Sequence, residues 1–195
     1  ITATVNGDTV SFDSPDNFNG SESFIATVTD GFASHSQTFT VTVIPVNDDP
    51  VLAAVPGVSF DEDSSTSITL SGSDIDGDGL SYSVSSGSDI TASLEGTTIT
   101  FTAAQDFYGS EEFTATVADD LASDSQTFTV TVNAVNDAPV LAAVTNVSFD
   151  EDGSGSTTLS GSDVDLDGLT YSISGGSDIT ATVNGDTVSF DSPDN

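Results

Sequence analysis

The residues of this chain most suited to chemistry are aspartates at alternate positions. The stretch "SDIDGDGLSYS", residues 73–83, places Asp74, Asp76 and Asp78 just before a glycine. A second copy of the pattern, "SDVDLDGLTYS", contains Asp163, Asp165 and Asp167. Two carboxylates about 4 Å apart repel each other by roughly 4 kcal/mol at an effective dielectric constant near 20. Because the chain has no Lys or Arg to neutralise such clusters, they predict a cation taken from solution.

The charge of the chain restricts its partners. Its 195 residues include 32 acids and one His, for a formal net charge of -32. We therefore expect no binding to nucleic acid or to anionic membrane surfaces. The absence of Cys excludes disulfides and thiolate metal sites. No apolar run approaches the length of a membrane span, so membrane insertion is not expected, while 35% hydrophobic residues suffice for a core.

The spacing of the aspartates favours calcium. "DIDGDG" reproduces the start of a calcium loop, in which alternate carboxylates point inward and glycine permits the tight turn. The Glu that such a loop carries at its twelfth position is replaced by Ser85 and, in the second copy, by Ser174. Other loops must then supply ligands, an arrangement that the loose oxygen geometry of calcium tolerates better than the octahedron of magnesium. Transition metals are disfavoured because the only imidazole is His35.

The chain is a tandem repeat with a period of 89 residues. "ITATVNGDTVSFDSPDN" at residues 1–17 recurs letter for letter at 179–195, and a diverged copy begins at Ile90. "SFDED" likewise begins at Ser59 and again at Ser148. Such self-similarity indicates an array of structural units.

Each repeat is predicted to be an all-β, immunoglobulin-like sandwich. Apolar residues alternate with Ser and Thr between turn residues, which indicates strands with one buried face. No stretch has the period of an amphipathic helix. Seven short strands in about 89 residues fit such a sandwich better than a barrel. In the complete repeat we predict strands at 51–60, 65–71, 80–86, 90–94, 98–103, 112–118 and 126–133.

The repeat boundaries divide the chain into three parts. Residues 1–49 supply the last four strands of one repeat, 50–137 form a complete repeat, and 138–195 supply the first five strands of the next. The chain begins with Ile1 rather than Met, as expected of a segment of a longer protein. Neither partial repeat can bury its core alone. We therefore expect each to meet its missing strands elsewhere in a longer chain or fibre.

The acids are expected to converge on the two joints between repeats, because alternate loops of a sandwich lie at the same end. At the first joint we expect Asp16, Asn47, Asp48, Asp49, Asp74, Asp76, Asp78 and Asp119 as ligands. At the second we expect Glu62, Asp106, Asn136, Asp137, Asp163, Asp165 and Asp167. Glu151 repeats the position of Glu62 in the third part. Asp61 and Asp63 lie in the same loop as Glu62, which converges on the second joint. Simple solvation stays open for these two acids and for Asp150 and Asp152.

The segments "FIATVTDGFASHSQTFTVTVIPVNDDP" and "SDIDGDGLSYSV" resemble cadherin repeats, especially the bacterial cadherin-like tandem repeats of giant secreted adhesins. The resemblance spans the whole chain and implies end-to-end sandwiches with Ca²⁺ between them. It also implies ligand roles for the two aspartate loops, for Glu62 and Asp119, and for the linkers Asn47–Asp48 and Asn136–Asp137. The further Asp of the cadherin linker is replaced here by Pro45 and Ala134. Fewer ions per joint are therefore expected than in cadherins.

The resemblance implies a structural function outside the cell. It predicts calcium-stiffened spacer repeats of a secreted adhesin or cell-surface fibre, whose partners are calcium ions and neighbouring repeats. Self-assembly into a filament or sheath by lateral association stays open, as does direct binding of polysaccharide, for which only Phe32 and Tyr108 are free aromatic candidates. An enzyme is not expected. Glu111 and Glu112 are strand neighbours that point to opposite faces, so they cannot flank one glycosidic bond.

Overall fold

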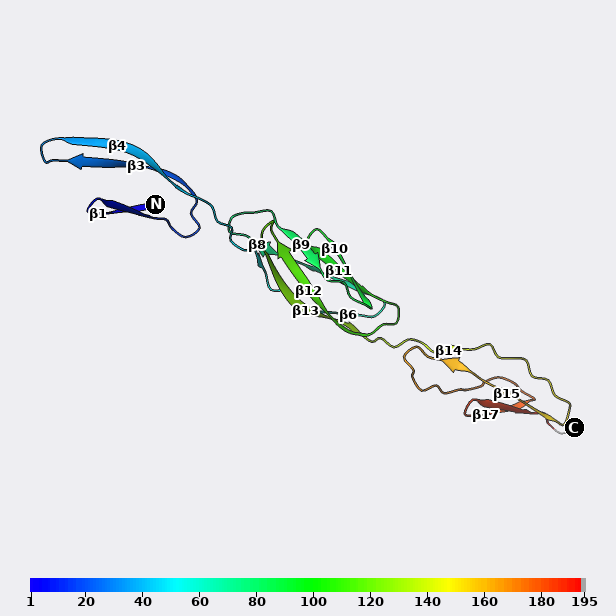
Figure 1. The fold of residues 1–195 in the computed structure, drawn as a ribbon. Coiled ribbons are helices and arrows are strands. Elements are labelled where there is room, and N and C mark those ends of the chain that lie inside the picture. The colour runs from blue at the N-terminus through cyan, green and yellow to red at the C-terminus, as the bar shows by residue number, and fades with distance from the viewer. Residues whose placement is uncertain (194–195) are drawn as a thin grey trace.

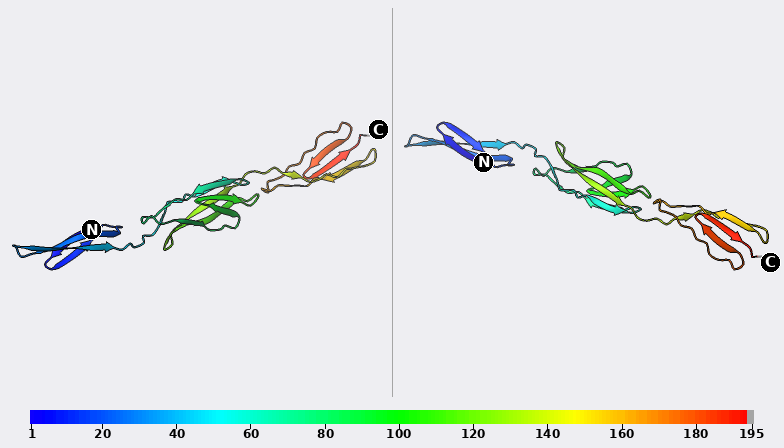
Figure 2. Two further views of the ribbon diagram at one scale, coloured as in Figure 1. Left: turned by 90° about the horizontal axis from the view of Figure 1, so that it is seen from above. Right: turned by 90° about the horizontal axis from the view of Figure 1, so that it is seen from below.

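The computed structural model describes residues 1–193 as strands and loops. This part of the chain contains no helix of the length and hydrophobicity needed to span a membrane. Figures 1 and 2 show three bodies arranged end to end, with the complete sandwich in the middle. The predicted all-β fold of tandem sandwich repeats is thus confirmed. The third part was predicted to run to residue 195, and its last two residues lie outside the described ones.

The middle repeat consists of two antiparallel layers closed by one parallel pair. The first sheet has the order β10-β11-β7, with β7 at Ser65–Thr69, β10 at Ile90–Glu95 and β11 at Thr98–Ala103. The second has the order β6-β13-β12-β9, in which β6 runs parallel to β13. Its strands are β6 at Val58–Asp61, β9 at Ser81–Val84, β12 at Gly109–Ala118 and β13 at Ser123–Asn133.

The first predicted strand, 51–60, is divided between two sheets. β5 (Val51–Leu52) pairs with β8 (Gly72–Ser73), whereas β6 pairs with β13. Between them Pro56 has no N–H to offer to a ladder. β12 and β13 each begin three residues before their predicted starts, because the hairpin register continues through Gly109–Glu111, opposite Val130–Val132, and through Ser123–Ser125, opposite Thr116–Ala118. The alternation of apolar residues does not reveal that extension.

Three phenylalanines form the centre of the core. Phe101, Phe113 and Phe128 come from β11, β12 and β13, and their ring centroids lie 5.3 to 6.1 Å apart. Phe101 and Phe113 have no exposed surface, as expected for alternate residues that face the opposite layer. The same three-ring group recurs one period earlier in Phe12, Phe24 and Phe39.

The two partial repeats form only those strands whose partners are present. The first consists of the hairpins β1–β2 and β3–β4. Their bounds are Thr2–Asn6, Thr9–Asp13, Gly20–Thr29 and Ser34–Val43. The third consists of β14 (Val140–Leu141), β15 (Ser154–Thr158), β16 (Gly161–Ser162), β17 (Thr180–Asn184) and β18 (Thr187–Asp191).

One prediction for the third part is wrong in detail. Its expected strands include a counterpart of β9, but residues 169–173 form no strand. In the middle repeat β9 is an edge strand held only by β12. The third part contains no counterpart of β12, so the backbone of 169–173 has no ladder to join.

Candidate metal centre

The first aspartate loop is folded by its own carboxylates. Asp74 Oδ1 accepts hydrogen bonds from the backbone N–H groups of Asp76 (2.8 Å) and Asp78 (3.3 Å). Gly77 takes a positive φ of 78° within this turn, a conformation that glycine adopts without steric cost. The turn brings one oxygen of each of the three acids within 4.8 Å of the others. The predicted clustering of these three acids is what the geometry shows.

The middle acid of each aspartate loop holds the linker that precedes it. The backbone N–H of Asp48 donates to Asp76 Oδ2 at 2.7 Å, and that of Asp137 donates to Asp165 Oδ2 at the same distance. The linker asparagines turn their side chains back onto the linker carbonyls, at 3.0 Å for Asn47 and 2.8 Å for Asn136. Both joints therefore use one geometry, repeated at the 89-residue period.

Asp119 contributes to the first joint and also caps its own loop. Its Oδ1 accepts the N–H groups of Leu121 and Ala122, each at 2.6 Å, and its Oδ2 accepts from Asn47 Nδ2 at 3.3 Å. The backbone donors of Ala122 and Leu121, followed by the Asn47 amide, lower the pKa of Asp119 and keep it ionised. Asp30 makes the same turn in the first part, so the capping role does not require a joint.

The second joint gathers acids from three separate segments. Oxygens of Asp63, Asp106 and Asp137 lie within 4.8 Å of one another. Asp63 and Asp106 both adopt positive φ angles, 57° and 55°, and the backbone N–H of Asp106 donates to Asp63 Oδ1 at 3.4 Å. Asp63, for which the sequence left open both a place at this joint and simple solvation, is exposed and belongs to the acidic group of the joint. Aspartate is one of the few residues that tolerate this backbone region, but nothing in the letters distinguishes Asp63 from its neighbours.

Glu62 is the most deeply placed acid of the second joint. Only 5% of its surface is exposed, and its Oε1 accepts the backbone N–H of Val135 in the linker. Its own backbone N–H donates to the carbonyl of Asn133 at 2.9 Å. The linker is thus held on its incoming side by Glu62 and on its outgoing side by Asp165.

Two carboxylate oxygens show where a cation fits. Within residues 1–193, Asp74 Oδ2 and Asp137 Oδ2 are buried and have no hydrogen-bond partner, an arrangement that costs free energy unless a positive group is supplied. Desolvation, and after it the carboxylates of Asp106 and Asp165, raise the pKa of Asp137. Desolvation, and after it the Asp74 and Asp76 carboxylates, raise the pKa of Asp78. These donors are all oxygens, which suits a hard divalent cation.

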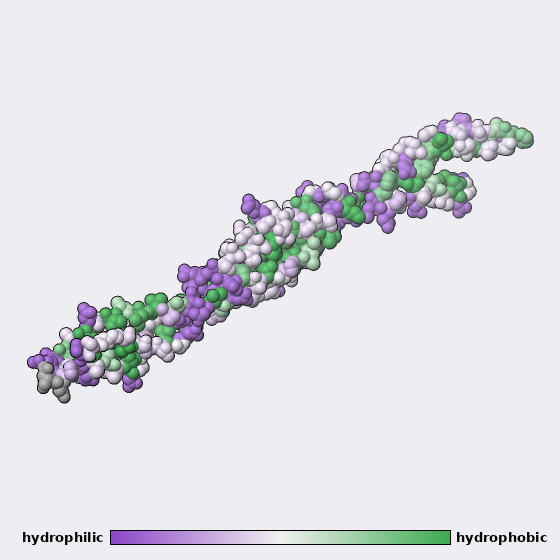
Figure 3. Space-filling view, turned by 180° about the vertical axis from the view of Figure 1, so that it is seen from behind, coloured by the Kyte–Doolittle hydropathy of each residue, from purple (hydrophilic) through white to green (hydrophobic). Residues whose placement is uncertain are grey.

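The two joints differ in the acids that surround the linker. At the first joint the linker meets an aspartate loop and the loop of Asp119, which belong to the repeat that follows it. At the second joint the linker meets the equivalent aspartate loop and also Glu62, Asp63 and Asp106, which belong to the repeat that precedes it. Hydrophilic surface gathers at both necks between the bodies (Figure 3).

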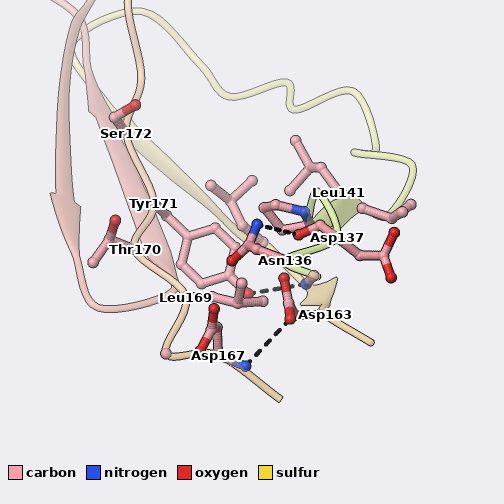
Figure 4. Close-up of a pocket in the computed structure, with 14 residues that line it drawn as sticks. Asn136, Asp137, Leu141, Asp163, Asp167, Leu169, Thr170, Tyr171 and Ser172 are labelled. Carbon is pink, nitrogen blue, oxygen red and sulfur yellow. Dashed lines mark hydrogen bonds between the residues drawn. The ribbon is translucent and has the colours of Figure 1, made fainter. Parts of the chain in front are cut away.

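The remaining predicted ligands fall into three groups. Asn136, Asp163 and Asp167 lie at one end of a cavity that is walled by Leu169 and Tyr171 (Figure 4). Asp163 Oδ1 accepts the N–H groups of the next two acids in its loop, as Asp74 does. Asp16 lines a hollow together with Asp48 and Asp76. The structure brings neither Asp49 nor Glu151, both exposed, into an acidic group among the described residues.

Glu111 is a structural acid rather than a member of a joint. Its carboxylate accepts the N–H and Oγ–H of Ser88 and the N–H groups of Asp89 and Ile90, with distances from 2.6 to 3.4 Å. These donors, Ser88 Oγ first, lower the pKa of Glu111. Glu112 is exposed, so the two side chains point to opposite faces as predicted. Nothing in the residue pattern around Glu111 predicts this contact.

The exposed aromatic residues are few. Phe32 is 99% exposed and Tyr108 is 56% exposed, as expected for the two free candidates. Phe39, at 38%, joins them because the first part lacks its covering strands. These three are spread over the first and middle parts, at residues 32, 39 and 108.

Comparisons with known proteins agree with the β-sandwich fold. Residues 47–133 match the family model described as bacterial Ig domain. No curated protein sequence matches the chain. Three protocadherin structures match at 15–16% identity. They are the Protocadherin GammaB4 extracellular domain (TM-score 0.53, 98% of this chain and 35% of that chain), Protocadherin Gamma B2 extracellular cadherin domains 1-5 (0.51, 98% and 43%) and Protocadherin Gamma B7 extracellular cadherin domains 1-4 (0.50, 99% and 55%).

The chain spans between about a third and just over half of the length of these structures. At such identities the likeness shows the fold, namely β-sandwiches joined end to end. The middle repeat is therefore similar to a bacterial Ig domain, and the chain consists of tandem immunoglobulin- and cadherin-like β-sandwich repeats.

Proposed function

We propose that these repeats are calcium-stiffened spacers of a long, secreted bacterial surface protein that supports adhesion. The observation that carries the proposal is the second joint. There a carboxylate oxygen of Asp137 lies within 4.8 Å of oxygens of Asp63 and Asp106, and Asp137 Oδ2 is buried without a hydrogen-bond partner. These three acids belong to the preceding repeat and the linker, and Asp165 of the following repeat holds the same linker residue. One ion at this point would therefore tie two domains together.

Calcium suits the donors better than other divalent cations. The joint offers carboxylate, amide and backbone oxygens from four segments, and calcium accepts six to eight oxygens in loose geometry. Asp63, Asp106, Glu62 and Asp137 would hold the ion at the second joint. Asp74, Asp76 and Asp78 would hold it at the first, with Asp119 beside them. Bound there, calcium would replace repulsion between acids by shared coordination and so fix the angle between neighbouring sandwiches.

The role is structural rather than catalytic. Bacterial Ig domains match the middle repeat, and such domains typically occur in surface and secreted proteins, which favours a location outside the cell. Extracellular calcium is abundant enough to fill sites of the modest affinity expected for such modules, about 10⁻⁴–10⁻³ M.

The test measures binding and stiffness together. Calorimetric titration of the 195-residue chain with calcium should show saturable binding, and titration with magnesium should show much weaker binding. Small-angle scattering of the monomeric fraction should give a narrow distribution of lengths in calcium and a broad one in chelator. Asp137→Asn should weaken calcium binding by about tenfold or more, since even outer-shell partners of metal sites are worth 10–100-fold.

The matched control is Asp178→Asn, which removes an acid that accepts a hydrogen bond from the hydroxyl of Ser177, away from both joints. It should leave affinity and stiffness unchanged. Absence of saturable binding at millimolar calcium, or equal flexibility with and without chelator, would overturn the proposal.

A further inference from the structure

The middle repeat is joined to its neighbours at opposite ends, as Figure 1 shows, so tension along the chain has to cross it. The load enters through the segment that contains β5 and β6 and leaves through β13, since these are the first and last strands of the repeat. We propose that the contacts of residues 52–62 with residues 124–135 form a mechanical clamp that keeps the repeat folded under load. The proposal rests on the fold of this complete repeat and is independent of the calcium sites proposed above.

The two sides of the clamp run in the same direction. Their contacts advance together, from Leu52 opposite Asp124 through Val55 opposite Gln126 to the parallel ladder of β6 and β13. Opposite pulls on the start of the first side and the end of the second therefore slide one along the other. Such sliding loads every hydrogen bond of the clamp at once, whereas strands that are peeled apart lose their bonds one at a time.

Side chains of β13 hold the clamp at the entry linker. Asp124 Oδ2 accepts the Leu52 N–H at 2.8 Å. Gln126 Nε2 donates to the Leu52 carbonyl at 2.7 Å, and its Oε1 accepts the Val55 N–H at 3.1 Å. β5 is thereby fixed to the last strand of the repeat, although its ladder partner is β8.

Close packing leaves little slack between β5 and β6. A Cβ added to Gly57 would lie 3.1 Å from the Thr129 carbonyl oxygen, so this segment passes directly over β13. Pro56 restricts the backbone of the same segment further. Because the segment already runs alongside β13, release of β5 alone would lengthen the chain little, and the load would pass at once to β6.

Contacts beyond the β6–β13 ladder extend the clamp into the exit linker. Asn133 Nδ2 donates to Asp61 Oδ1 at 3.1 Å, and the Glu62 N–H donates to the Asn133 carbonyl at 2.9 Å. The Glu62 carboxylate in turn accepts the Val135 N–H. The exit linker is therefore tied to the first side of the clamp as well as to β13, and the whole repeat should unfold in a single step when the clamp breaks.

Pulling the same chain in two directions tests the clamp, because the folded structure stays the same while the direction of the load changes. The chain has no cysteine of its own, so pairs of introduced cysteines can carry the handles. Ile44→Cys with Val144→Cys brackets the complete repeat at exposed positions and loads the clamp by sliding. Tyr108→Cys with Val144→Cys places the handles at the open end of the β12–β13 hairpin, where Gly109 pairs with Val132, and peels β13 away.

Both pairs are compared in chelator at one pulling rate, so that the outcome does not depend on calcium. The sliding geometry should need a several-fold higher force to unfold the repeat than the peeling geometry. It should also give a single step in which the whole repeat lengthens. A sliding force no higher than the peeling force, or release of the first strand in a separate step at low force, would overturn the proposal while leaving calcium binding at the joints untouched.

Two substitutions separate the clamp from the general stability of the repeat. Gln126→Ala removes two hydrogen bonds that the sliding load has to break, so it should speed unfolding under that load by about 10–100-fold. Glu111→Gln is the matched control, because it weakens bonds to residues 88–90, which lie outside the clamp. It should lower the equilibrium stability but leave the unfolding rate under the sliding load unchanged. If Gln126→Ala unfolded no faster than Glu111→Gln, the clamp would be refuted.

Discussion

Glu62 holds the linker and also contributes a negative charge to the proposed calcium site. Two substitutions at this position should separate these two roles. The side chain is 5% exposed and accepts the Val135 N–H, which fastens the linker to the preceding domain. It also lies among the acids proposed to bind calcium, and it contributes to the raised pKa of Asp137. Glu62→Gln keeps an acceptor of the same shape but removes the charge. Glu62→Ala removes both.

The structure sets the expected magnitudes without calcium. Glu62→Ala leaves the partly buried Val135 N–H without its acceptor, which costs about 1–3 kcal/mol of unfolding free energy. For a domain of this size each kcal/mol lowers Tm by roughly 4–8 °C. Glu62→Gln exchanges a charge-assisted hydrogen bond for a neutral one, a loss of about 1 kcal/mol, while it also removes repulsion from neighbouring acids. Its Tm in chelator should therefore stay within a few degrees of the unmodified chain.

In calcium the two variants should converge. A ligand that binds only the folded state stabilises it by RT ln(1 + [L]/Kd), about 2.7 kcal/mol when calcium is at 100 times its Kd. Both variants lose the charge and should lose most of this gain. Thermal unfolding at matched calcium and chelator concentrations, with calorimetric titration, measures both quantities.

Two outcomes would refute the reasoning. A Glu62→Gln variant that binds calcium as tightly as the unmodified chain would show that the charge of Glu62 has no part in the site. A Glu62→Ala variant that is as stable in chelator as the unmodified chain would show that the contact with Val135 does not fasten the linker.

Four further substitutions test three separate features of the fold. Leu166 has a φ of 64° at the position where the first loop has Gly77. Leu166→Gly should therefore stabilise the third part, and Gly77→Leu should destabilise the middle repeat, each by about 1–2 kcal/mol. Urea unfolding measures both changes. Glu111→Gln should cost about 1–2 kcal/mol at neutral pH, discounted for partial exposure. Because the folded-state pKa of Glu111 is lowered, its contribution is present above the ordinary value near 4.5 and is lost as pH falls through the lower folded value. Phe128→Ala should cost about 3–5 kcal/mol, measured by denaturant unfolding.

Each of these has its own control or contrary result. Glu112→Gln, on the exposed neighbour of Glu111, should change neither stability nor its dependence on pH, and an unchanged acid slope in Glu111→Gln would contradict the assigned contacts. If Leu166→Gly and Gly77→Leu changed the free energy of unfolding in the same direction, the steric argument would be contradicted. Loss of less than about 1 kcal/mol in Phe128→Ala would mean that the three rings do not form the centre of the core.

The sequence by itself determined the repeat, the fold class and the general place of the acids. The 89-residue period and the alternation of apolar residues favoured β-sandwiches, because seven short strands with one apolar face each bury those faces between two sheets. The two aspartate loops could also be predicted from the sequence, since their contacts are local. Asp74 accepts hydrogen bonds from residues two and four positions further on, and the spacing of the residues in sequence is enough to predict a contact of that kind.

Only the tertiary structure decided which distant acids meet. Asp63 joins Asp106 and Asp137 across 43 and 31 further residues, whereas the equally acidic Asp49 and Glu151 are exposed and lie outside both acidic groups. Strand pairing likewise depended on partners far along the chain, as the missing counterpart of β9 at residues 169–173 shows. The physical reason is common to both. A carboxylate or a backbone N–H finds its partner through the path of the whole fold, which the identity of its neighbours in sequence does not encode.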